Sequence, residues 1–466
     1  LIISPPIESD KFNIEPQSTI SKKIKIEFTD SLSLNDQTTY TFNFGSSIED
    51  NNESNTLPFF SYTLSTGPVI DSLFIKGKVS DAFEEDSERF VSIYLYPIDS
   101  THNDSTIYLK KPLYATSTLD SVLYNFQNLR EDTYQIIAIK DYGKNYLYDQ
   151  GVDKIGFINK EVSLPGDTLY NFKLFKEQPK FFWDRPKYVN DHHIVFGYYG
   201  TPEKNPIELI TPVPEGFETF ITKVREKDSL NFWFPEIEAD SLQFAIKTKD
   251  SIYNVSVKFY SPELDSLVIS PKQNRIIDLN DTLEFNSSLP ITELNKEFIT
   301  LKNKDSIILP FQLILDKNRD IIQMHFEHEP NDKYSVSVLP NAFKDPWGGT
   351  NDSINLNLIT KAYDSYGVIN LKLNWEIKEQ DFILELLDIN NNILSRVSEK
   401  NKLNTYTFEF LNPTDYKARI ILDDNKNKKW DTGNYLKKIQ PERVIYFSDT
   451  IELRANWEIN EVFILK

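Results

Sequence analysis

Residues 126–134 read FQNLREDTY, and residues 408–416 read FEFLNPTDY. The two stretches share Phe, Leu and Tyr at the same three places, at an offset of 282 residues. The same offset relates several further pairs, namely Asp141/Asp423, Asn145/Asn427, Asp149/Asp431, Gly151/Gly433 and Asp167-Thr168/Asp449-Thr450. Self-similarity over about 40 positions indicates that one structural unit is present twice.

Both copies carry strand patterns before and after the repeated stretch. Residues 73–79 (LFIKGKV) and 367–373 (GVINLKL) alternate apolar and polar side chains, which is typical of a half-buried strand. Apolar residues 134–139 and 416–422 predict a further strand in each copy, and a polar loop rich in Asp, Asn and Gly follows it. Each copy is therefore predicted to be a small β-sandwich.

A second, looser repeat lies upstream of each of these copies. Residues 40–44 (YTFNF) and 334–338 (YSVSV) both lead into an Asp/Asn/Gly turn, and a last alternating strand follows at 59–65 and 354–359. Between the repeats, residues 176–262 contain several short apolar runs that suit one more sandwich. The sequence thus predicts five segments, 1–68, 69–175, 176–262, 263–360 and 361–466.

Composition supports an all-β fold of tandem antiparallel β-sandwiches. Aromatic residues make up 13% of the chain, with 32 Phe and 24 Tyr, and aromatic side chains favour the pleated surface of a sheet. No stretch holds a 3.6-residue apolar period, so long helices are not expected. At 466 residues, several domains are expected.

Charge and cysteine content exclude several classes of function. The net charge of −19 would repel a phosphate backbone, so we expect no nucleic-acid partner. The chain has no cysteine, which excludes disulfides, thiolate metal sites and cysteine nucleophiles within it. The sequence has no apolar run of about 18 residues. It begins at Leu1 without Met or signal peptide, so we expect that processing or truncation removed an upstream segment.

At these residues the chain resembles a known group of proteins. Residues 40–67 (YTFNFGSSIEDNNESNTLPFFSYTLSTG) are similar to the closing half of an SbsA-type Ig-like domain, and residues 126–149 and 408–433 resemble the carboxypeptidase-regulatory, prealbumin-like (transthyretin-like) fold. The combination is similar to Ig-like-domain lipoproteins of Bacteroidetes. This resemblance implies Ig-like segments at 1–68 and 263–360, prealbumin-like segments at 69–175 and 361–466, and an outer-membrane, cell-surface location through a lipid anchor upstream of Leu1.

The first Ig-like segment is predicted to be incomplete. Leu1 to Ile3 occupy the place that Phe298 to Leu301 occupy in the second Ig-like segment, where residues 283–292 precede them. The N-terminal strand is then missing from residues 1–68, which would leave an unpaired edge and an open core. We expect an upstream segment or a partner to supply it.

The sharpest candidate site is a loop with oxygen-bearing side chains at positions 1, 3, 5 and 9, namely Asp423, Asn425, Asn427 and Asp431. This spacing is how a turn wraps a structural Ca²⁺ ion. The loop departs from the motif at position 6, Lys428, and at position 12, Asn434, where Gly and Glu are usual. The alternative is an Asx-rich turn without metal. A second, weaker candidate in the first copy comprises Asp141, Asn145 and Asp149, with Gly143 at position 3.

Other side chains are weaker candidates. His325 and His328 lack the order and helical setting of a zinc site, and we expect them to be surface strand residues. His192 and His193 are expected to be exposed, and residues 50–53 to form a solvated acidic turn. Trp347 is either a recognition residue or a ring folded over the end of its sandwich, and the second is favoured. Trp183, Trp233 and Trp375 are expected in cores.

No catalytic motif is present, so a non-enzymatic role is expected. The chain has neither a Gly-x-Ser-x-Gly elbow nor a Gly-rich phosphate loop. The favoured hypothesis is a surface lipoprotein that acts as a scaffold or accessory subunit bound to an outer-membrane protein complex, such as assembly or export machinery. The alternative is an adhesin or glycan-binding surface module, which would require a concave binding surface.

Overall fold

The computed structural model describes residues 1–16, 20–45, 47–57, 60–202, 206–225, 227–248, 251–260, 266–378, 380–400 and 405–466. Strands dominate these residues, and the helical elements among them are short: α1 (Thr106–Leu109) and the 3-10 turns η1 (Ser9–Lys11), η2 (Lys296–Phe298) and η3 (Tyr363–Ser365). The fold is all-β, as predicted. No helix among the described residues is both long and apolar enough to cross a membrane.

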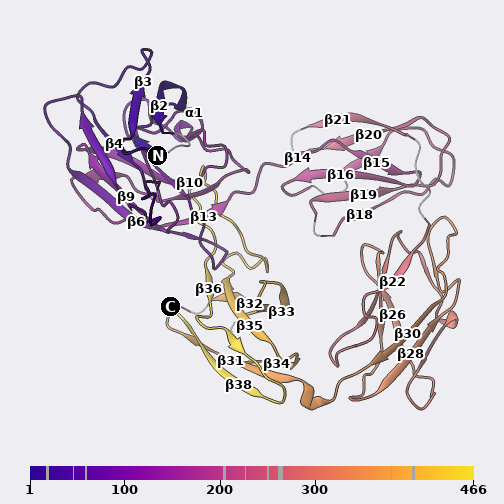
Figure 1. Ribbon diagram of the computed structural model, residues 1–466. Coiled ribbons are helices and arrows are strands. Elements are labelled where there is room, and N and C mark those ends of the chain that lie inside the picture. Colours follow the sequence, from indigo (N-terminus) through magenta and orange to yellow (C-terminus); the bar gives the residue numbers. More distant parts are fainter. Residues whose placement is uncertain are drawn as a thin grey trace.

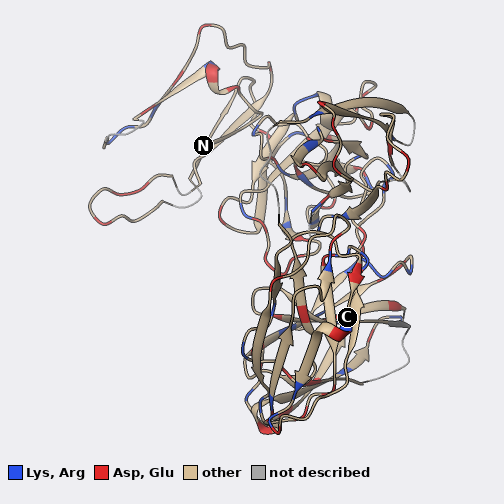
Figure 2. Ribbon diagram, turned by 90° about the vertical axis from the view of Figure 1, so that its right-hand side faces the viewer, with Lys and Arg blue, Asp and Glu red and all other residues tan. Residues whose placement is uncertain are grey.

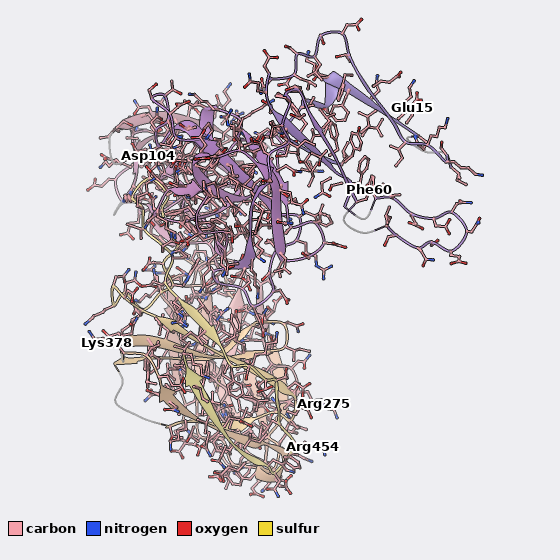
Figure 3. All side chains as sticks on the ribbon, turned by 90° about the vertical axis from the view of Figure 1, so that its left-hand side faces the viewer. Glu15, Phe60, Asp104, Arg275, Lys378 and Arg454 are labelled. Atoms are coloured by element: carbon pink, nitrogen blue, oxygen red, sulfur yellow. The ribbon has the colours of Figure 1, made fainter. Side chains whose placement is uncertain are left out.

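Figure 1 shows the arrangement of the predicted segments, which we call segments 1 to 5 in chain order. Segments 2, 3, 4 and 5 follow one another around a circuit, and segment 5 returns to segment 2. Segment 1 projects from this circuit, as the labels of Glu15 and Phe60 show in Figure 3. The boundary predicted at 262/263 lies outside the described residues.

Segment 2 is a sandwich whose strands join into one strongly curved sheet in the order β8-β7-β10-β11-β13-β6-β9. Its strands are β6 (Leu73–Asp81), β7 (Ser92–Pro97), β8 (Tyr114–Ser117), β9 (Leu123–Leu129), β10 (Asp132–Lys140), β11 (Lys154–Phe157), β12 (Val162–Leu164) and β13 (Phe172–Lys176). Alternate residues of β10 face two different cores, because Tyr134, Ile136 and Ala138 join one apolar cluster and Ile137 and Ile139 join another.

Segment 5 repeats these eight strands in the same order. They are β31 (Gly367–Trp375), β32 (Asp381–Asp388), β33 (Ile393–Lys400), β34 (Thr405–Leu411), β35 (Asp415–Leu422), β36 (Val444–Tyr446), β37 (Ile451–Glu452) and β38 (Glu458–Leu465). In each segment the last strand pairs in parallel with the first, β13 with β6 and β38 with β31. The predicted duplication is therefore confirmed at the level of strand order.

Fine detail in the two copies explains why the Phe, Leu and Tyr spacing recurs. The Tyr134 hydroxyl donates to the Arg130 carbonyl at 2.9 Å, and the Tyr416 hydroxyl donates to the Asn412 carbonyl at 2.6 Å. Both copies also have an irregular step in the strand pair that contains Phe126 or Phe408. The same three side chains thus fix one corner of each sandwich.

The predicted register is wrong beyond Gly151 and Gly433. Ile139 and Ile421, which are 282 residues apart, pair with Ile155 and Val444, which are 289 apart. Segment 5 therefore contains seven additional residues between its polar loop and β36. The matching Asp167-Thr168 and Asp449-Thr450 are not structurally equivalent, because their identity at the old offset is a coincidence of composition.

Segments 1 and 4 share a three-stranded sheet, β1-β4-β5 in one and β25-β28-β30 in the other. Ile3 pairs with Phe42 as Leu301 pairs with Val336, so the predicted equivalence of β1 with the strand after Phe298 is confirmed. Segment 1 contains β1 (Ile2–Ser4), β2 (Phe12–Glu15), β3 (Lys25–Phe28), β4 (Thr39–Asn43) and β5 (Ser61–Ser65). Phe59, the predicted start of the last strand, lies outside the described residues.

Segment 4 has a larger second sheet than segment 1. Its strands are β22 (Ile269–Pro271), β23 (Leu283–Ser287), β24 (Glu293–Leu294), β25 (Ile299–Lys302), β26 (Gln312–Leu315), β27 (Ile321–His325), β28 (Lys333–Val338), β29 (Phe343–Lys344) and β30 (Ile354–Ile359). In it, β27 pairs with both β26 and β23, whereas in the described part of segment 1 β3 pairs with β2 alone. The expectation of one missing strand thus understates the difference, because both β22 and β23 lack counterparts there.

Segment 3 forms the additional sandwich that was predicted. It contains β14 (Phe182–Trp183), β15 (Lys187–Asn190), β16 (His193–Tyr199), β17 (Ile207–Leu209), β18 (Phe220–Lys223), β19 (Ser229–Trp233), β20 (Ser241–Lys247) and β21 (Ile252–Lys258). Two sheets, β14-β16-β19-β18 and β17-β20-β21, enclose a core that includes the buried Trp183.

Candidate functional site

The loop after β35 brings the four predicted metal-binding side chains of segment 5 together. The Asp423 carboxylate accepts hydrogen bonds from the backbone N–H groups of Asn427 (3.1 Å) and Lys428 (2.9 Å). Asp431 Oδ2 accepts from the side-chain amides of Asn425 and Asn427, at 2.5 and 2.6 Å. Amide and backbone hydrogens thus occupy the oxygens that a cation would otherwise use.

This geometry is compatible with calcium but does not require it. Rotation of the two amide groups by half a turn would present their oxygens to the centre of the loop. Asn434, at position 12, instead exchanges backbone hydrogen bonds with Ile439, outside the cluster. Among the described residues, no group of three or more His, Cys, Asp or Glu side chains could hold a metal ion. Calcium binding therefore stays a prediction.

The equivalent loop in segment 2 is built in the same way. Asn145 donates its backbone N–H to Asp141 at 3.3 Å and its amide to Asp149 Oδ2 at 3.0 Å. Asp141 also accepts from the Tyr94 hydroxyl at 2.9 Å, which occupies the oxygen that position 3 leaves free. Asp141, Asn145 and Asp149 therefore lie together, with one cation donor fewer than the loop in segment 5.

A buried carboxylate clamps each loop, and sequence reasoning missed both. Glu442 accepts the N–H groups of Asp424 and Asp431, each at 2.9 Å. Asp153 accepts those of Tyr142 (3.0 Å) and Asp149 (2.9 Å) in the first copy. The two clamps are equivalent only at the offset of 289 residues, so the misread register concealed them.

Both clamping carboxyl groups have raised pKa values. Burial is the main cause for Glu442, and repulsion from Asp431 and Asp423 adds to it. Burial likewise raises the pKa of Asp153, with repulsion from Asp141 and Asp149. A group with a raised pKa stabilises the folded loop fully below its ordinary pKa, and that contribution is lost as the pH rises through the raised value.

A bound cation would reverse this effect at Glu442, because positive charge favours the ionised carboxyl. We expect an NMR titration of Glu442 to give a midpoint above about 4.3, and millimolar CaCl₂ to lower it. Asp431→Asn should lower the midpoint without calcium and abolish the response to calcium. A midpoint that calcium leaves unchanged would contradict the predicted calcium site.

The seven additional residues of segment 5 carry the chain from this loop onto segment 2. The Tyr435 ring is fully buried within an apolar cluster of segment 2 that includes Tyr96, Ile137 and Phe175. It packs edge-on against Phe157, with ring centres 5.4 Å apart. Because the loop of segment 2 lacks this extension, only segment 5 can reach its counterpart in this way.

Polar contacts surround Tyr435. Its backbone N–H donates to Glu177 Oε1 at 2.6 Å, and its hydroxyl accepts from the Gln135 amide at 2.8 Å. Glu177 is 1% exposed, and its other oxygen accepts from the Tyr148 hydroxyl and the Gln150 amide. One buried carboxylate therefore joins the polar loop of segment 2 to the extended loop of segment 5.

The rim of this contact is formed mainly by segment 5 side chains that reach backbone carbonyls of segment 2. Thr432 donates to Lys176 O at 2.7 Å, and Gln440 donates to Phe157 O at 3.0 Å. The Lys438 ammonium pairs with Asp104, at 2.7 Å. Gly433 lies against the Phe175 ring, where an added Cβ would approach it to 2.6 Å, so glycine is required there.

A second patch lies beside the first. Phe83 of segment 2 packs on the Trp430 ring (4.7 Å between ring centres) and on the Arg419 guanidinium (4.2 Å). Its carbonyl accepts from the Tyr446 hydroxyl at 3.0 Å, and Lys417 pairs with Glu85 at 2.9 Å. We call the two patches together the closing junction, since they complete the circuit seen in Figure 1.

The remaining candidate residues have structural contacts. His192, Trp347 and Trp233 meet where segment 3 joins segment 4, and His192 stacks on Trp347 with ring centres 4.1 Å apart. The prediction that His192 and His193 are exposed is wrong, because both are half-buried against tryptophan rings. Trp347 accordingly packs on a neighbouring segment, and Trp233 is core, as predicted.

His325 and His328 are also half-buried, which corrects the expectation of surface residues. His328 packs edge-on against Phe326, and burial lowers its pKa. Residues 50–53 form an exposed turn in which Asp50 accepts the Glu53 N–H at 3.1 Å. Trp375 is half-buried against the core of segment 5.

Comparison with known proteins gives no family. No known family profile matches the chain, and no curated protein matches it. Solved structures match only loosely: three domains of titin (12% identity, TM-score 0.16, 59% of this chain and 97% of that one), the *Bacillus cereus* major pilin BcpA (10%, 0.16, 84% and 98%) and the *Bacteroides ovatus* glucan-utilization protein SGBP-B (8%, 0.19, 89% and 98%). At these TM-scores the similarities carry no argument about function.

Proposed function

We propose that the chain is a non-enzymatic cell-surface protein that acts as a rigid scaffold or accessory subunit bound to an outer-membrane protein complex. The observation that carries this proposal is the closing junction. A contact that fixes segment 5 on segment 2 restrains the angles between all the segments of the circuit, and a scaffold needs fixed geometry. The outer-membrane location and the lipid anchor follow only from the resemblance described above.

Calcium has a structural place in this proposal. A cation at Asp423, Asn425, Asn427 and Asp431 would order the loop that presents Thr432, Gly433 and Tyr435 to segment 2. It would also offset the mutual repulsion of the loop carboxylates and the Glu442 clamp. The first loop, with Asp141, Asn145 and Asp149, would bind more weakly because it offers fewer donors.

Purification from native membranes tests the scaffold role. The tagged protein, extracted in mild detergent, should co-purify with an outer-membrane protein in a fixed stoichiometry. A variant with an open closing junction (Tyr435→Ala) should retain less of that partner than a variant with a change at a nearby exposed position (Leu436→Ala). Recovery of a monomer without a membrane partner would refute the proposal.

A further inference from the structure

A groove lies where segment 1 meets segment 2, away from the closing junction. Twenty-one residues line about 580 Å³, a size typical of ligand sites. Its floor is the outward face of β6 and β9, with Lys76, Lys78, Asn125 and Gln127, and its opposite wall is the outward face of β1, β4 and β5, with Thr41 and Asn43. Neighbouring side chains on one sheet face thus point into the same space.

The groove is held open by contacts between the two segments rather than by chance proximity. Asn128 donates its amide to Thr41 Oγ1 at 3.0 Å and to Thr63 Oγ1 at 3.1 Å. The Thr39 hydroxyl donates to Asp71 at 2.8 Å, and the Ala115 N–H donates to Ser4 Oγ at 3.1 Å. These bonds cross from segment 1 to segment 2 on either side of the groove, so its walls are preformed.

The charge of the lining contrasts with that of the chain. Asp and Glu make up 70 of 466 residues, so 21 average residues would include about three, yet the lining contains none. Figure 2 shows acidic residues distributed over the molecule as a whole. The lining includes two lysines, Lys76 and Lys78, and within the described residues neither ammonium group has a carboxylate within ion-pair distance.

The chemistry of the lining selects among possible ligands. Apart from the two lysines, its polar side chains are hydroxyls and amides, such as Ser61, Ser117, Asn125, Gln127 and Asn171. These groups both donate and accept, as the hydroxyl groups of a sugar require. The two ammonium groups would pair with acidic substituents through charge-assisted hydrogen bonds.

Two other classes of polymer fit less well. A peptide strand binds by main-chain pairing with a free sheet edge, but the floor of this groove is a sheet face. Single-stranded nucleic acid needs exposed rings for stacking, but the aromatic residues of the lining, Tyr124 and Phe126, are 3% and 2% exposed. We therefore propose that this groove binds an oligosaccharide that carries acidic groups, such as a uronic-acid chain.

Calorimetric titration of the whole chain with an oligogalacturonate of four to six sugars tests this proposal. Saturable binding is expected in 150 mM NaCl, weaker binding in 500 mM NaCl because of screening, and no measurable binding of a neutral oligosaccharide of equal length. Lys76→Gln/Lys78→Gln should weaken the affinity by at least about tenfold, since two charge-assisted contacts are lost.

The matched control is Lys187→Gln/Lys372→Gln, which changes the net charge equally at two exposed positions elsewhere. It should change the affinity by less than about twofold. Asn125→Ala/Gln127→Ala, which leaves charge unchanged, should also weaken binding, and thermal unfolding verifies that each variant is folded. The proposal fails if no acidic oligosaccharide binds, if the groove variants bind as well as the control, or if an acidic peptide or single-stranded DNA of equal charge binds equally tightly. Such failure would leave the scaffold role of the closing junction untouched.

Discussion

Replacing Tyr435 by alanine should release segment 5 from segment 2. The ring is fully buried among side chains of segment 2, and its loss would leave a cavity and an unpaired Gln135 amide. Truncation of a buried aromatic ring costs about 3–5 kcal/mol, which would shift the equilibrium between closed and open forms by a factor of about 10²–10³.

Small-angle X-ray scattering should then show a larger radius of gyration, and hydrogen exchange should increase in residues 426–443 and in α1. Leu436→Ala is the matched control, because Leu436 is the next residue and is 46% exposed; its effect should stay within about 0.5 kcal/mol. Exchange in segment 3 serves as the internal reference for overall folding. An unchanged radius with unchanged exchange would show that Tyr435 does not hold the junction.

Replacing Glu385 by alanine should destabilise segment 5 as strongly. The Glu385 side chain is fully buried and accepts from Arg419 Nε at 2.6 Å and from Arg396 Nε at 2.7 Å. Arg419, 4% exposed, would keep its charge beneath Phe83 without a counterion. Breaking a buried pair in this way costs about 3–5 kcal/mol.

The measurement is the opening free energy of segment 5, from exchange of the β32 and β35 amides. A double change to apolar residues, Glu385→Leu/Arg419→Met, should recover most of the loss because no charge is then buried alone. Glu452→Ala, at an exposed position of the same segment, should be close to neutral. If the single Glu385 change were equally neutral, the buried pair would contribute nothing to stability.

The sequence predicted the duplicated sandwiches because their determinants are local. Phe126, Leu129 and Tyr134 act within one corner of a sheet, and the alternation in residues 73–79 reports a single strand. The grouping of Asp423, Asn425, Asn427 and Asp431 was predictable for the same reason, since four side chains of one short loop must meet when the loop turns back. Whether a cation joins them depends on amide orientation, which spacing does not encode.

The closing junction could not be predicted in this way. Tyr435 and Glu177 are separated by 258 residues, and no period or motif links them. The insertion that brings them together was hidden because Asp-Thr recurs at the unshifted offset, and in an acidic chain such coincidences are common. The Glu442 and Asp153 clamps were missed with it, since they align only after the insertion is recognised.

The closing junction also determines how the molecule would carry mechanical load. Tension applied between residues 1 and 466 would run from segment 1 into segment 2 and then straight across to segment 5. Segments 3 and 4 would hang slack in a side branch of this path and would feel no force while Tyr435 and Phe83 hold. If the junction yielded, the span of the chain would lengthen in one abrupt step, with every sandwich still folded.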